Sequence, residues 1–258
     1  MFQLSKWYLD VTTPDGTAVI CYAARLRWGL LRVRYTSILV AIPGERPDET
    51  FSLRQVERPI INQGTVRWRS EPLDVDGEWH RRQPAIRETL LRDHGGAIRW
   101  LCRMPLASAT VRWGSRRFNG VGYVESLGMT LPPTQMPFHT LRWGRHLSAE
   151  RSLVWIDWSG KVPGQWVWLD GVRQRGVTFG DDGTIQLPGG RRLHLSDSRD
   201  IRNQPVLPAL LTALPNVAQH VAGSLGSLHE HKMVARSALH DGLLPLDSGW
   251  TVHEVVTC

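Results

Sequence analysis

The chain has 258 residues, enough for one large domain or two small ones. Its composition, 41% hydrophobic and 21% charged, is ordinary for a folded chain and excludes an intrinsically disordered protein. Lys and Arg number 31 against 24 Asp and Glu, a net charge of +7, but the arginines are spread along the chain and form no long run or helical stripe. We therefore expect them on solvent-facing strand surfaces and expect no nucleic-acid partner, with nucleic-acid binding kept as the alternative.

The cysteines and the chain start constrain the cell compartment. Cys21, Cys102 and Cys258 are widely separated and include no Cys-x-x-Cys pair, so neither a zinc site nor a disulfide framework is predicted. The first residues lack a basic segment followed by an apolar one, and no apolar run approaches the roughly 18 residues of a membrane span. We expect a cytoplasmic protein, with peripheral membrane contact through a lipid-like ligand left open.

Short alternating segments separated by turn residues run through the first half of the chain. The turn at 13–16 (Thr-Pro-Asp-Gly) and the loop at 93–96 (Asp-His-Gly-Gly) carry residues that tight turns favour. Alternation of apolar residues with Arg predicts strands with one solvent-facing side. The predicted strands lie at residues 6–11, 17–22, 25–28, 30–35, 38–42, 52–56, 64–70, 73–75, 85–91 and 97–104.

The second half continues with strands at roughly ten-residue spacing, which predicts a closed or nearly closed antiparallel barrel. Only residues 206–214 and 216–222 have a helical pattern, and neighbouring prolines limit each to a turn or two. The prolines around residue 135 make a stiff connection, so we predict domains 1–135 and 136–258. The predicted strands lie at residues 140–143, 153–158, 165–169, 173–179, 184–187, 191–195, 229–239 and 250–256.

The stretch 111–160 has the densest chemistry. Its pattern predicts two strand pairs joined by a Pro-rich crossing, and it holds four of the twelve tryptophans. Tyr123 and Glu125 are two apart on one predicted strand, so both side chains point to the same face while Val124 points to the other. Their neighbours are aromatic and apolar, a setting in which a carboxylic acid can keep its proton at neutral pH and donate it.

The runs 118–125 (FNGVGYVE), 138–145 (FHTLRWGR) and 155–158 (WIDW) resemble the core of the carotenoid hydratase (hydroxyneurosporene synthase) family. That family belongs to a group of tandem lipocalin-like proteins that includes AttH-like proteins and the fungal decalin-forming pericyclases. Members carry G-Y-x-D-x-N-x-G followed by R-W-x-W or R-W-x-R. Here Glu125 replaces the Asp, Leu127 replaces the Asn, and a glycine, Gly128, lies one position before the last glycine of the motif.

The resemblance implies an all-β fold of two lipocalin-like antiparallel β-barrel or β-sandwich domains packed together, with one or two short helices near residues 206–222. It further implies an aromatic-lined cavity that takes a hydrophobic small molecule and requires no cofactor. More loosely, it extends to a Trp-His pair at 79–80, which would line the same cavity.

The implied chemistry is hydration or cyclisation of an isoprenoid or polyene, which needs a strong acid, aromatic faces for the cation and a dry cavity. Glu125 would be the acid, Tyr123 would orient it or relay a proton, and His139 or His80 would position water or recycle the proton. Asp157 is either a second buried acid or a salt-bridge partner of Arg142 or Arg145. The residues assigned to substrate binding are Trp79, His80, Arg142, Trp143, Asp157 and Trp158.

Other interpretations stay open. The same cavity could hold a lipid or pigment for transport, with Glu125 only hydrogen-bonded inside it. The His-Glu-His pattern at 229–231 has a spacing that can bind metal, but no third ligand accompanies it, so we expect no metal. Serines lie near histidines without a G-x-S-x-G elbow, which makes a serine hydrolase a weak alternative. These serines are Ser115, Ser126 and Ser148.

Overall fold

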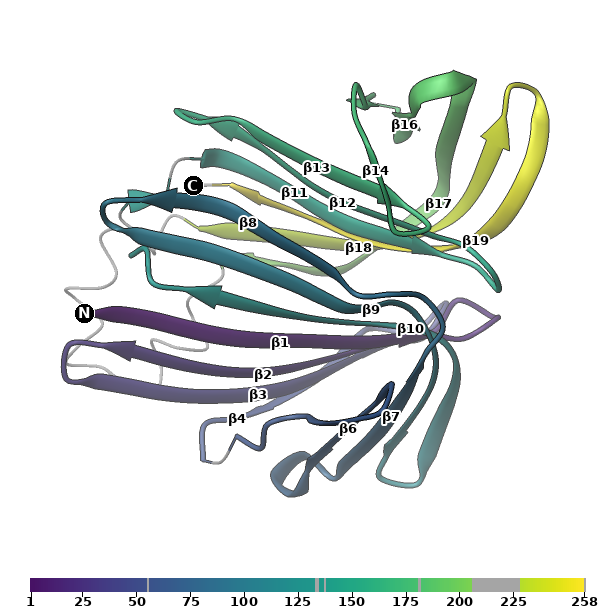
Figure 1. Cartoon of the computed structure of the whole chain (residues 1–258). Helices are drawn as coiled ribbons and strands as arrows, with labels where there is room; N and C mark the ends of the chain where they lie inside the picture. Colours follow the sequence, from purple (N-terminus) through teal and green to yellow (C-terminus); the bar gives the residue numbers. More distant parts are fainter. Residues whose placement is uncertain (55, 133–134, 137, 181, 206–227, 258) are drawn as a thin grey trace. The chain divides into compact units, whose positions relative to one another are not determined.

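The computed structural model describes residues 1–257 except 55, 133–134, 137, 181 and 206–227 (Figure 1). Within them the chain forms strands joined by turns and short 3-10 helices, which confirms the all-β class. It separates into two compact units, whose described parts are residues 1–136 (unit 1) and residues 138–205 with 228–257 (unit 2). The helical turns predicted at 206–222 lie outside the described residues. Among the described residues, no helix has the length and apolar character needed to cross a membrane.

Unit 1 is one antiparallel sheet with the order β4-β3-β2-β1-β10-β9-β7-β6-β5, and β8 also pairs with β9. A 3-10 helix, η1 (Glu71–Leu73), joins β6 to β7. The strands are β1 (Phe2–Thr12), β2 (Ala18–Trp28), β3 (Leu31–Ala41), β4 (Asp48–Ser52), β5 (Ile60–Asn62), β6 (Thr65–Ser70), β7 (Val75–Arg81), β8 (Ile86–Asp93), β9 (Gly96–Trp113) and β10 (Arg116–Met129).

Strands β2 and β3 are longer than predicted. The predicted breaks after Tyr22 and Tyr35 do not occur, and Ala23 and Ala24 pair with Thr36 and Tyr35. Neither break carries Gly, Pro, Asn or Asp, so nothing there stops the ladder. The turn before β2 is as expected: the Asp15 carboxylate accepts a hydrogen bond from the Thr17 amide (3.1 Å), and its pKa is lowered, chiefly by the Thr13 hydroxyl.

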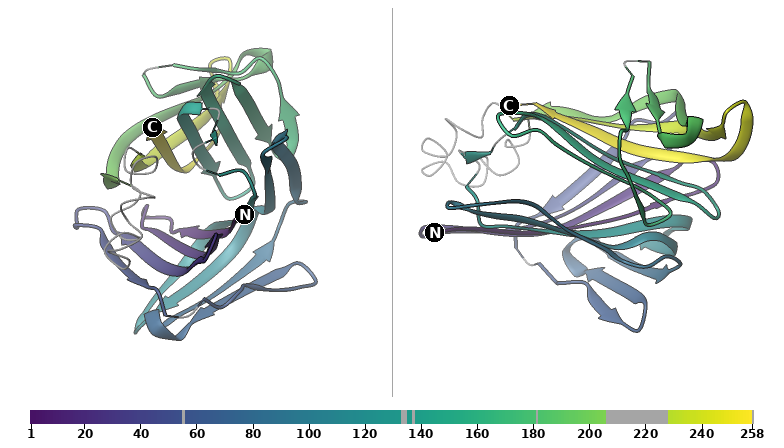
Figure 2. Two further views of the ribbon diagram at one scale, coloured as in Figure 1. Left: turned by 90° about the vertical axis from the view of Figure 1, so that its left-hand side faces the viewer. Right: turned by 45° about the horizontal axis from the view of Figure 1, so that its top comes forward.

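The core of unit 1 lies on one face of this sheet. The sheet curves so strongly that side chains of β6 and β7 share one cluster with those of β1, β2 and β3 (Figures 1 and 2). Leu9 on β1 and Val124 on β10 belong to this core, so their neighbours along each strand point to the opposite face. That opposite face is also buried at Tyr8 and Tyr123, which means that β1 and β10 are covered on both sides.

Unit 2 repeats the plan with the order β14-β13-β12-β11-β19-β18-β17-β16-β15, all antiparallel. Its core includes Leu153, Trp155, Val167 and Leu239 on one face. A 3-10 helix, η3 (Pro188–Gly190), precedes β17. The strands are β11 (Phe138–Leu147), β12 (Ser152–Gly160), β13 (Gly164–Leu169), β14 (Val172–Gln174), β15 (Thr178–Phe179), β16 (Thr184–Gln186), β17 (Arg191–Pro205), β18 (His229–Asp241) and β19 (Leu244–Thr257).

Neither sheet closes by backbone pairing between its two ends, as far as the described residues go. The pairing runs from edge strand β4 to edge strand β5 in unit 1, and from β14 to β15 in unit 2. Strand spacing predicted a closed or nearly closed barrel, and the described strands form two curved antiparallel sheets that remain open. Strand spacing reflects how many strands there are, but closure depends on tilt and shear, which spacing does not encode.

Two histidines lie on the core side of unit 2, His146 buried and His253 half-buried. His146 on β11 lies beside Ser237, with Nδ1 2.7 Å from the hydroxyl oxygen, and Thr251 donates to that same hydroxyl (2.9 Å). Burial lowers the pKa of His146 to about 4, and burial chiefly lowers that of His253 to about 4 as well, helped by the nearby His231 and Lys232. Both imidazoles are therefore neutral in the folded chain near pH 7.

We predict that the free energy of unfolding falls as pH drops from about 6.5 to about 4. The folded-state pKa values lie below the unfolded value, so the unfolded chain takes up protons first, and each histidine costs about 2 kcal/mol at pH 5. Urea unfolding followed by Trp fluorescence at pH 7.5 and 5.0 measures the difference. His146→Asn should shrink it, and His94→Asn, an exposed control, should not. Equal stability of the unaltered chain at both pH values would contradict this.

Candidate functional site

Glu125 is a buried acid held by two donors on the face of β10 opposite the core. Its side chain is 7% exposed and Tyr123 is fully buried. The Tyr123 hydroxyl donates to Glu125 Oε2 (2.7 Å), and Trp100 Nε1 on β9 donates to the same oxygen (2.5 Å). The predicted common face of Tyr123 and Glu125 is thus present, and Trp100 is a third member that the sequence did not indicate.

A second tyrosine–acid pair lies next to the first. On β1 the Tyr8 hydroxyl donates to Asp10 Oδ2 (2.8 Å), and both residues are buried. Tyr8 pairs with Glu125 and Asp10 pairs with Tyr123 across the two strands, so all four side chains share one face. The rings of Tyr8 and Tyr123 meet edge to face at 5.9 Å. We call Tyr8, Asp10, Trp100, Cys102, Tyr123 and Glu125 the two-acid cluster.

Irregular pairing between β9 and β10 positions this cluster. The register shifts on both sides of Val124, so that Val124 pairs with Met104 while Glu125 pairs with Cys102. Between these two pairs β9 advances by two residues while β10 advances by one. This is the pattern of a β-bulge, which changes the direction of nearby side chains. Cys102 is thereby turned to the cluster face, in contact with Tyr123.

Tyr123 and Cys102 stay neutral within the cluster. Burial raises the pKa of Tyr123 well above its usual range, and the nearby Cys102 and Glu125 raise it further. Burial likewise raises the pKa of the Cys102 thiol well above normal, with Glu125 and Asp10 adding to the rise. Cys102 is therefore no thiolate nucleophile, and Tyr123 acts as a hydrogen-bond donor.

Trp79 and His80 do not join Glu125. Trp79 lies in the core of unit 1, where its Nε1 donates to the backbone oxygen of Asp10 (2.6 Å). His80 points the other way, with a side chain that is 59% exposed and an Nε2 atom 3.1 Å from Glu78. Adjacent residues of a strand face opposite sides, so this pair could never have lined one wall together.

The other predicted site residues belong to unit 2. His139 is exposed at the start of β11, where the pairing with β12 is irregular. Arg142 and Asp157 lie directly opposite one another on β11 and β12, and Asp157 accepts a hydrogen bond from Gln165 (3.2 Å). Arg145 is buried on the other face of β11 and donates to the Trp250 carbonyl (3.2 Å), so it is not the partner of Asp157.

The tryptophans of unit 2 are engaged within the protein. The Lys232 ammonium lies 5.8 Å from the Trp143 ring centre, so a protein cation already occupies a cation-binding face of this ring. Lys232 is fully buried and forms ion pairs with Glu230 (2.8 Å) and Glu254. Trp158 stacks on Phe138 at 5.6 Å, meets Trp166 edge-on at 4.6 Å and donates to the Val162 carbonyl.

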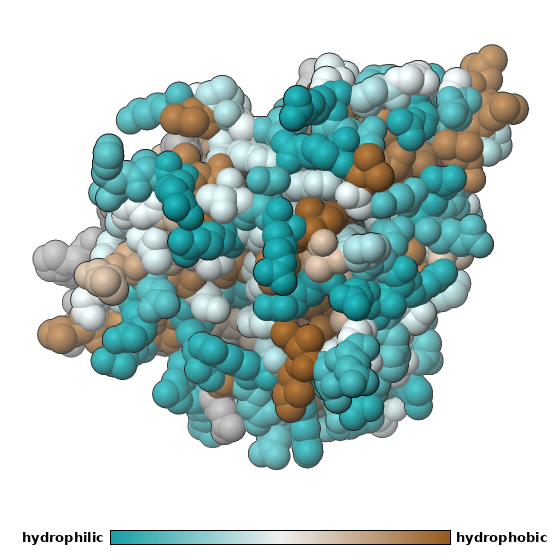
Figure 3. Space-filling view, in the orientation of Figure 1, coloured by the Kyte–Doolittle hydropathy of each residue, from teal (hydrophilic) through white to brown (hydrophobic). Residues whose placement is uncertain are grey.

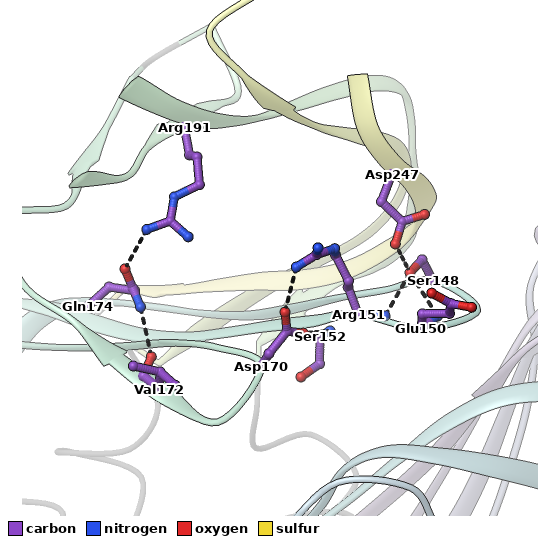
Figure 4. Close-up of polar contacts among 9 residues, drawn as sticks. All are labelled: Ser148, Glu150, Arg151, Ser152, Asp170, Val172, Gln174, Arg191 and Asp247. Atoms are coloured by element: carbon purple, nitrogen blue, oxygen red, sulfur yellow. Dashed lines mark hydrogen bonds and ion pairs between the residues drawn. The ribbon is translucent and has the colours of Figure 1, made fainter. Parts of the chain in front are cut away.

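The serine and histidine considered for a hydrolase or a metal site form hydrogen bonds within the protein. Ser148 caps the turn between β11 and β12: its hydroxyl oxygen accepts from the Arg151 amide (3.0 Å) and its hydrogen goes to Asp247 (Figure 4). His231 lies against Asp200, with Nε2 2.7 Å from Oδ1. In the described part of the chain, no group of three or more His, Cys, Asp or Glu residues is placed to hold a metal.

An open groove of about 540 Å³ follows β8, β9 and β10. Trp100, which donates to Glu125, is one of its lining residues, and so is Ser126, the next residue after Glu125. Ser126 pairs with Leu101 and Gly128 pairs with Arg99, so these lining residues share the face of the sheet opposite Glu125, and the groove reaches the two-acid cluster only through Trp100. Its other lining residues are Arg87, Glu88, Thr89, Arg99, Leu101 and Gly128.

The fold is shared with several solved structures. The chain superimposes on CghA, determined with Sch210972, with a TM-score of 0.64 at 11% identity, covering 99% of this chain and 88% of that one. Kievitone hydratase from Nectria haematococca gives 0.54 at 10% identity, with 99% and 88% covered. An AttH-like protein of Nitrosomonas europaea gives 0.55 at 10%, with 98% and 91% covered. No protein-family model and no curated protein sequence matches the chain.

These neighbours confirm the lipocalin-like fold class inferred from the sequence, with similarity that extends over nearly the whole chain. At 10–11% identity they establish the fold alone.

Asp10, Tyr8, Trp100 and Cys102 were missed as site residues. A usable signal existed for the first two, because Tyr8-Leu9-Asp10 repeats the Tyr-x-acid spacing of residues 123–125. Trp100 and Cys102 carried none, since their approach to Glu125 depends on the β9–β10 register.

We predict opposite effects for two glycines that flank the acid on β10. A Cβ at Gly122 would lie 2.6 Å from both the Ala109 Cβ and the Asp10 carbonyl oxygen, so Gly122→Ala should destabilise the chain by about 2 kcal/mol or more. A Cβ at Gly128 meets nothing within 4 Å, so Gly128→Ala should be neutral or stabilising by up to about 1 kcal/mol. Urea midpoints measure both, and equal midpoints would contradict the packing described.

Proposed function

We propose that this protein is a cofactor-independent hydratase or cyclase that protonates an alkene of a hydrophobic isoprenoid or polyene. The observation that carries the proposal is the buried Glu125 carboxyl, whose Oε2 accepts hydrogen bonds from Tyr123 and Trp100. Support also comes from a fold shared with kievitone hydratase and CghA.

The two donors define what Glu125 does as an acid. With Oε2 engaged by both of them, the acidic hydrogen of the neutral form sits on Oε1. When that proton leaves, negative charge develops on a carboxylate that already accepts two hydrogen bonds, so the donors stabilise the product of proton transfer without rearranging. Tyr123 can act as a hydrogen-bond donor to Glu125 because its raised pKa keeps the hydroxyl proton on the tyrosine.

The hydration step balances without a cofactor. The alkene π electrons take the proton from Glu125 Oε1, forming a C–H bond and leaving a carbocation. A water oxygen bonds to the cation, and the extra proton of that water returns to Glu125. In a cyclisation a second double bond captures the first cation, and loss of a proton from the ring cation restores Glu125.

The aromatic groups nearest the acid are those of the cluster itself. Trp100 donates to Glu125, and the Tyr8 ring meets both Tyr22 (5.3 Å) and Tyr123 (5.9 Å) edge to face. Faces of such rings stabilise cations in low-dielectric surroundings. Asp10 supplies a second buried carboxyl on the same face. We assign to it the relay of the released proton back to Glu125.

Glu125→Gln tests the proposal. The amide oxygen can still accept from Tyr123 and Trp100, so the fold should persist, but the amide cannot donate a proton to carbon. The chain is expressed in a host that makes acyclic carotenoids and other polyprenoids, and co-purifying lipids are identified by mass spectrometry. We expect an alkene together with its hydrated or cyclised form, and loss of the converted form by at least about 100-fold in the variant.

Two controls make the result specific. Glu71→Gln changes an acid on η1 whose side chain is 67% exposed and should leave conversion unchanged. Incubation of the purified chain with the recovered, unlabelled alkene in D₂O should add one deuterium on carbon per converted molecule, since the proton comes from the solvent-equilibrated acid. Recovery of one unaltered lipid from both the original chain and Glu125→Gln would instead identify a carrier, and an empty protein would contradict both.

A further inference from the structure

The turn between β18 and β19 carries a cluster of exposed leucines. Leu243 is 89% exposed, Leu244 71% and Leu246 40%. The end of this hairpin is the brown projection at the upper right of Figure 3, on a face that is otherwise mostly hydrophilic. Single exposed apolar residues are normal, but three within four positions at a hairpin end form a patch that water disfavours.

The hairpin end is braced, so these leucines are held outward. The Gly242 amide donates to the Gly190 carbonyl (3.2 Å), which ties the turn to η3. Asp247, one residue after the last leucine, accepts the hydroxyl of Ser148 from the neighbouring β11–β12 turn (Figure 4). Pairing of Asp241 with Leu244 closes the hairpin up to its last residues. A loop fixed in this way cannot fold its leucines back onto unit 2.

Two arginines lie behind the leucines, together with the exposed acid Asp241. Arg191 and Arg192 at the start of β17 pair with Asp241 and His240, directly behind the turn. Arg192 is exposed, and Arg191 is half-buried through contacts with Pro188 and Gln174. An apolar end backed by arginines matches the layers of a bilayer surface, with acyl chains below charged headgroups.

A second copy of the chain fits this patch less well. Stable protein interfaces bury about 800 Å² on each partner, and three leucine side chains at a narrow hairpin end offer well under that. A lipid bilayer is fluid, so a small apolar hairpin end can insert into it without a surface of complementary shape.

We propose that the β18–β19 turn, through Leu243, Leu244 and Leu246, inserts into the headgroup region of a lipid bilayer, with Arg191 and Arg192 at the phosphate level. The purpose of this insertion rests on the proposed function, because polyene hydrocarbons dissolve in bilayers and the protein would take up its substrate there. The insertion itself is measured without turnover.

Co-sedimentation with vesicles tests it, using phosphatidylcholine alone and phosphatidylcholine with 30 mol% (about one third) phosphatidylserine. We expect binding to both, stronger with phosphatidylserine. The double variant Leu243→Ser/Leu244→Ser should lower the partition coefficient roughly tenfold or more. Leu30→Ser, which changes a fully exposed leucine in the β2–β3 turn, is the matched control and should bind like the unaltered chain. Arg192→Ser should lower binding to the anionic vesicles alone, roughly fivefold.

The result is independent of catalysis. Glu125→Gln should bind vesicles like the unaltered chain, so a failure of the chemistry leaves the insertion result intact, and the reverse holds too. Absence of vesicle binding by the unaltered chain, or equal binding by the double leucine variant, overturns the proposal. So does sedimentation velocity showing a dimer that the leucine substitutions dissociate while vesicle binding is absent.

Discussion

The two hydrogen bonds onto Glu125 Oε2 depend on the register between strands β9 and β10. Tyr123 is part of the same strand as the acid, but Trp100 reaches it only because β9 passes an extra residue opposite Val124. Burial makes the geometry consequential, since a carboxyl group taken out of water without partners would cost several kcal/mol, on the order of 2–7 for polar groups in general. The long β9–β10 hairpin and its pairing with β1 and β8 are therefore what make an acid tolerable at this position.

Much of the architecture could be read from the sequence. Alternation and turn chemistry predicted the strands on either side of residues 93–96, the two strand pairs within 111–160 and the terminal hairpin. The common face of Tyr123 and Glu125 follows from the two-residue period of a strand, which no tertiary contact can alter. Closure of the sheets could not be read, and neither could the absence of breaks inside β2 and β3, because both depend on pairing between segments far apart in the chain.

The site was harder to predict than the fold for the same reason. Residue types suited to cations, such as Trp143 and Trp158, occur where the resemblance placed them, but their ring faces and edges are occupied by Lys232, Phe138 and Trp166. Composition cannot distinguish a tryptophan that awaits a ligand from one that already has neighbours. Trp79 is the clearest example, since its indole joins the core and holds the backbone of the strand that carries Asp10.

The antiparallel pairing of β1 with β10 places a local two-fold axis through the Leu9–Val124 pair. This axis relates Tyr8 to Tyr123 and Asp10 to Glu125, so the backbone treats the two acids as equivalent. What distinguishes them is chemical: Glu125 is one methylene longer, and Trp100 donates to it. The indole of Trp100 therefore gives two acids in equivalent backbone positions different surroundings.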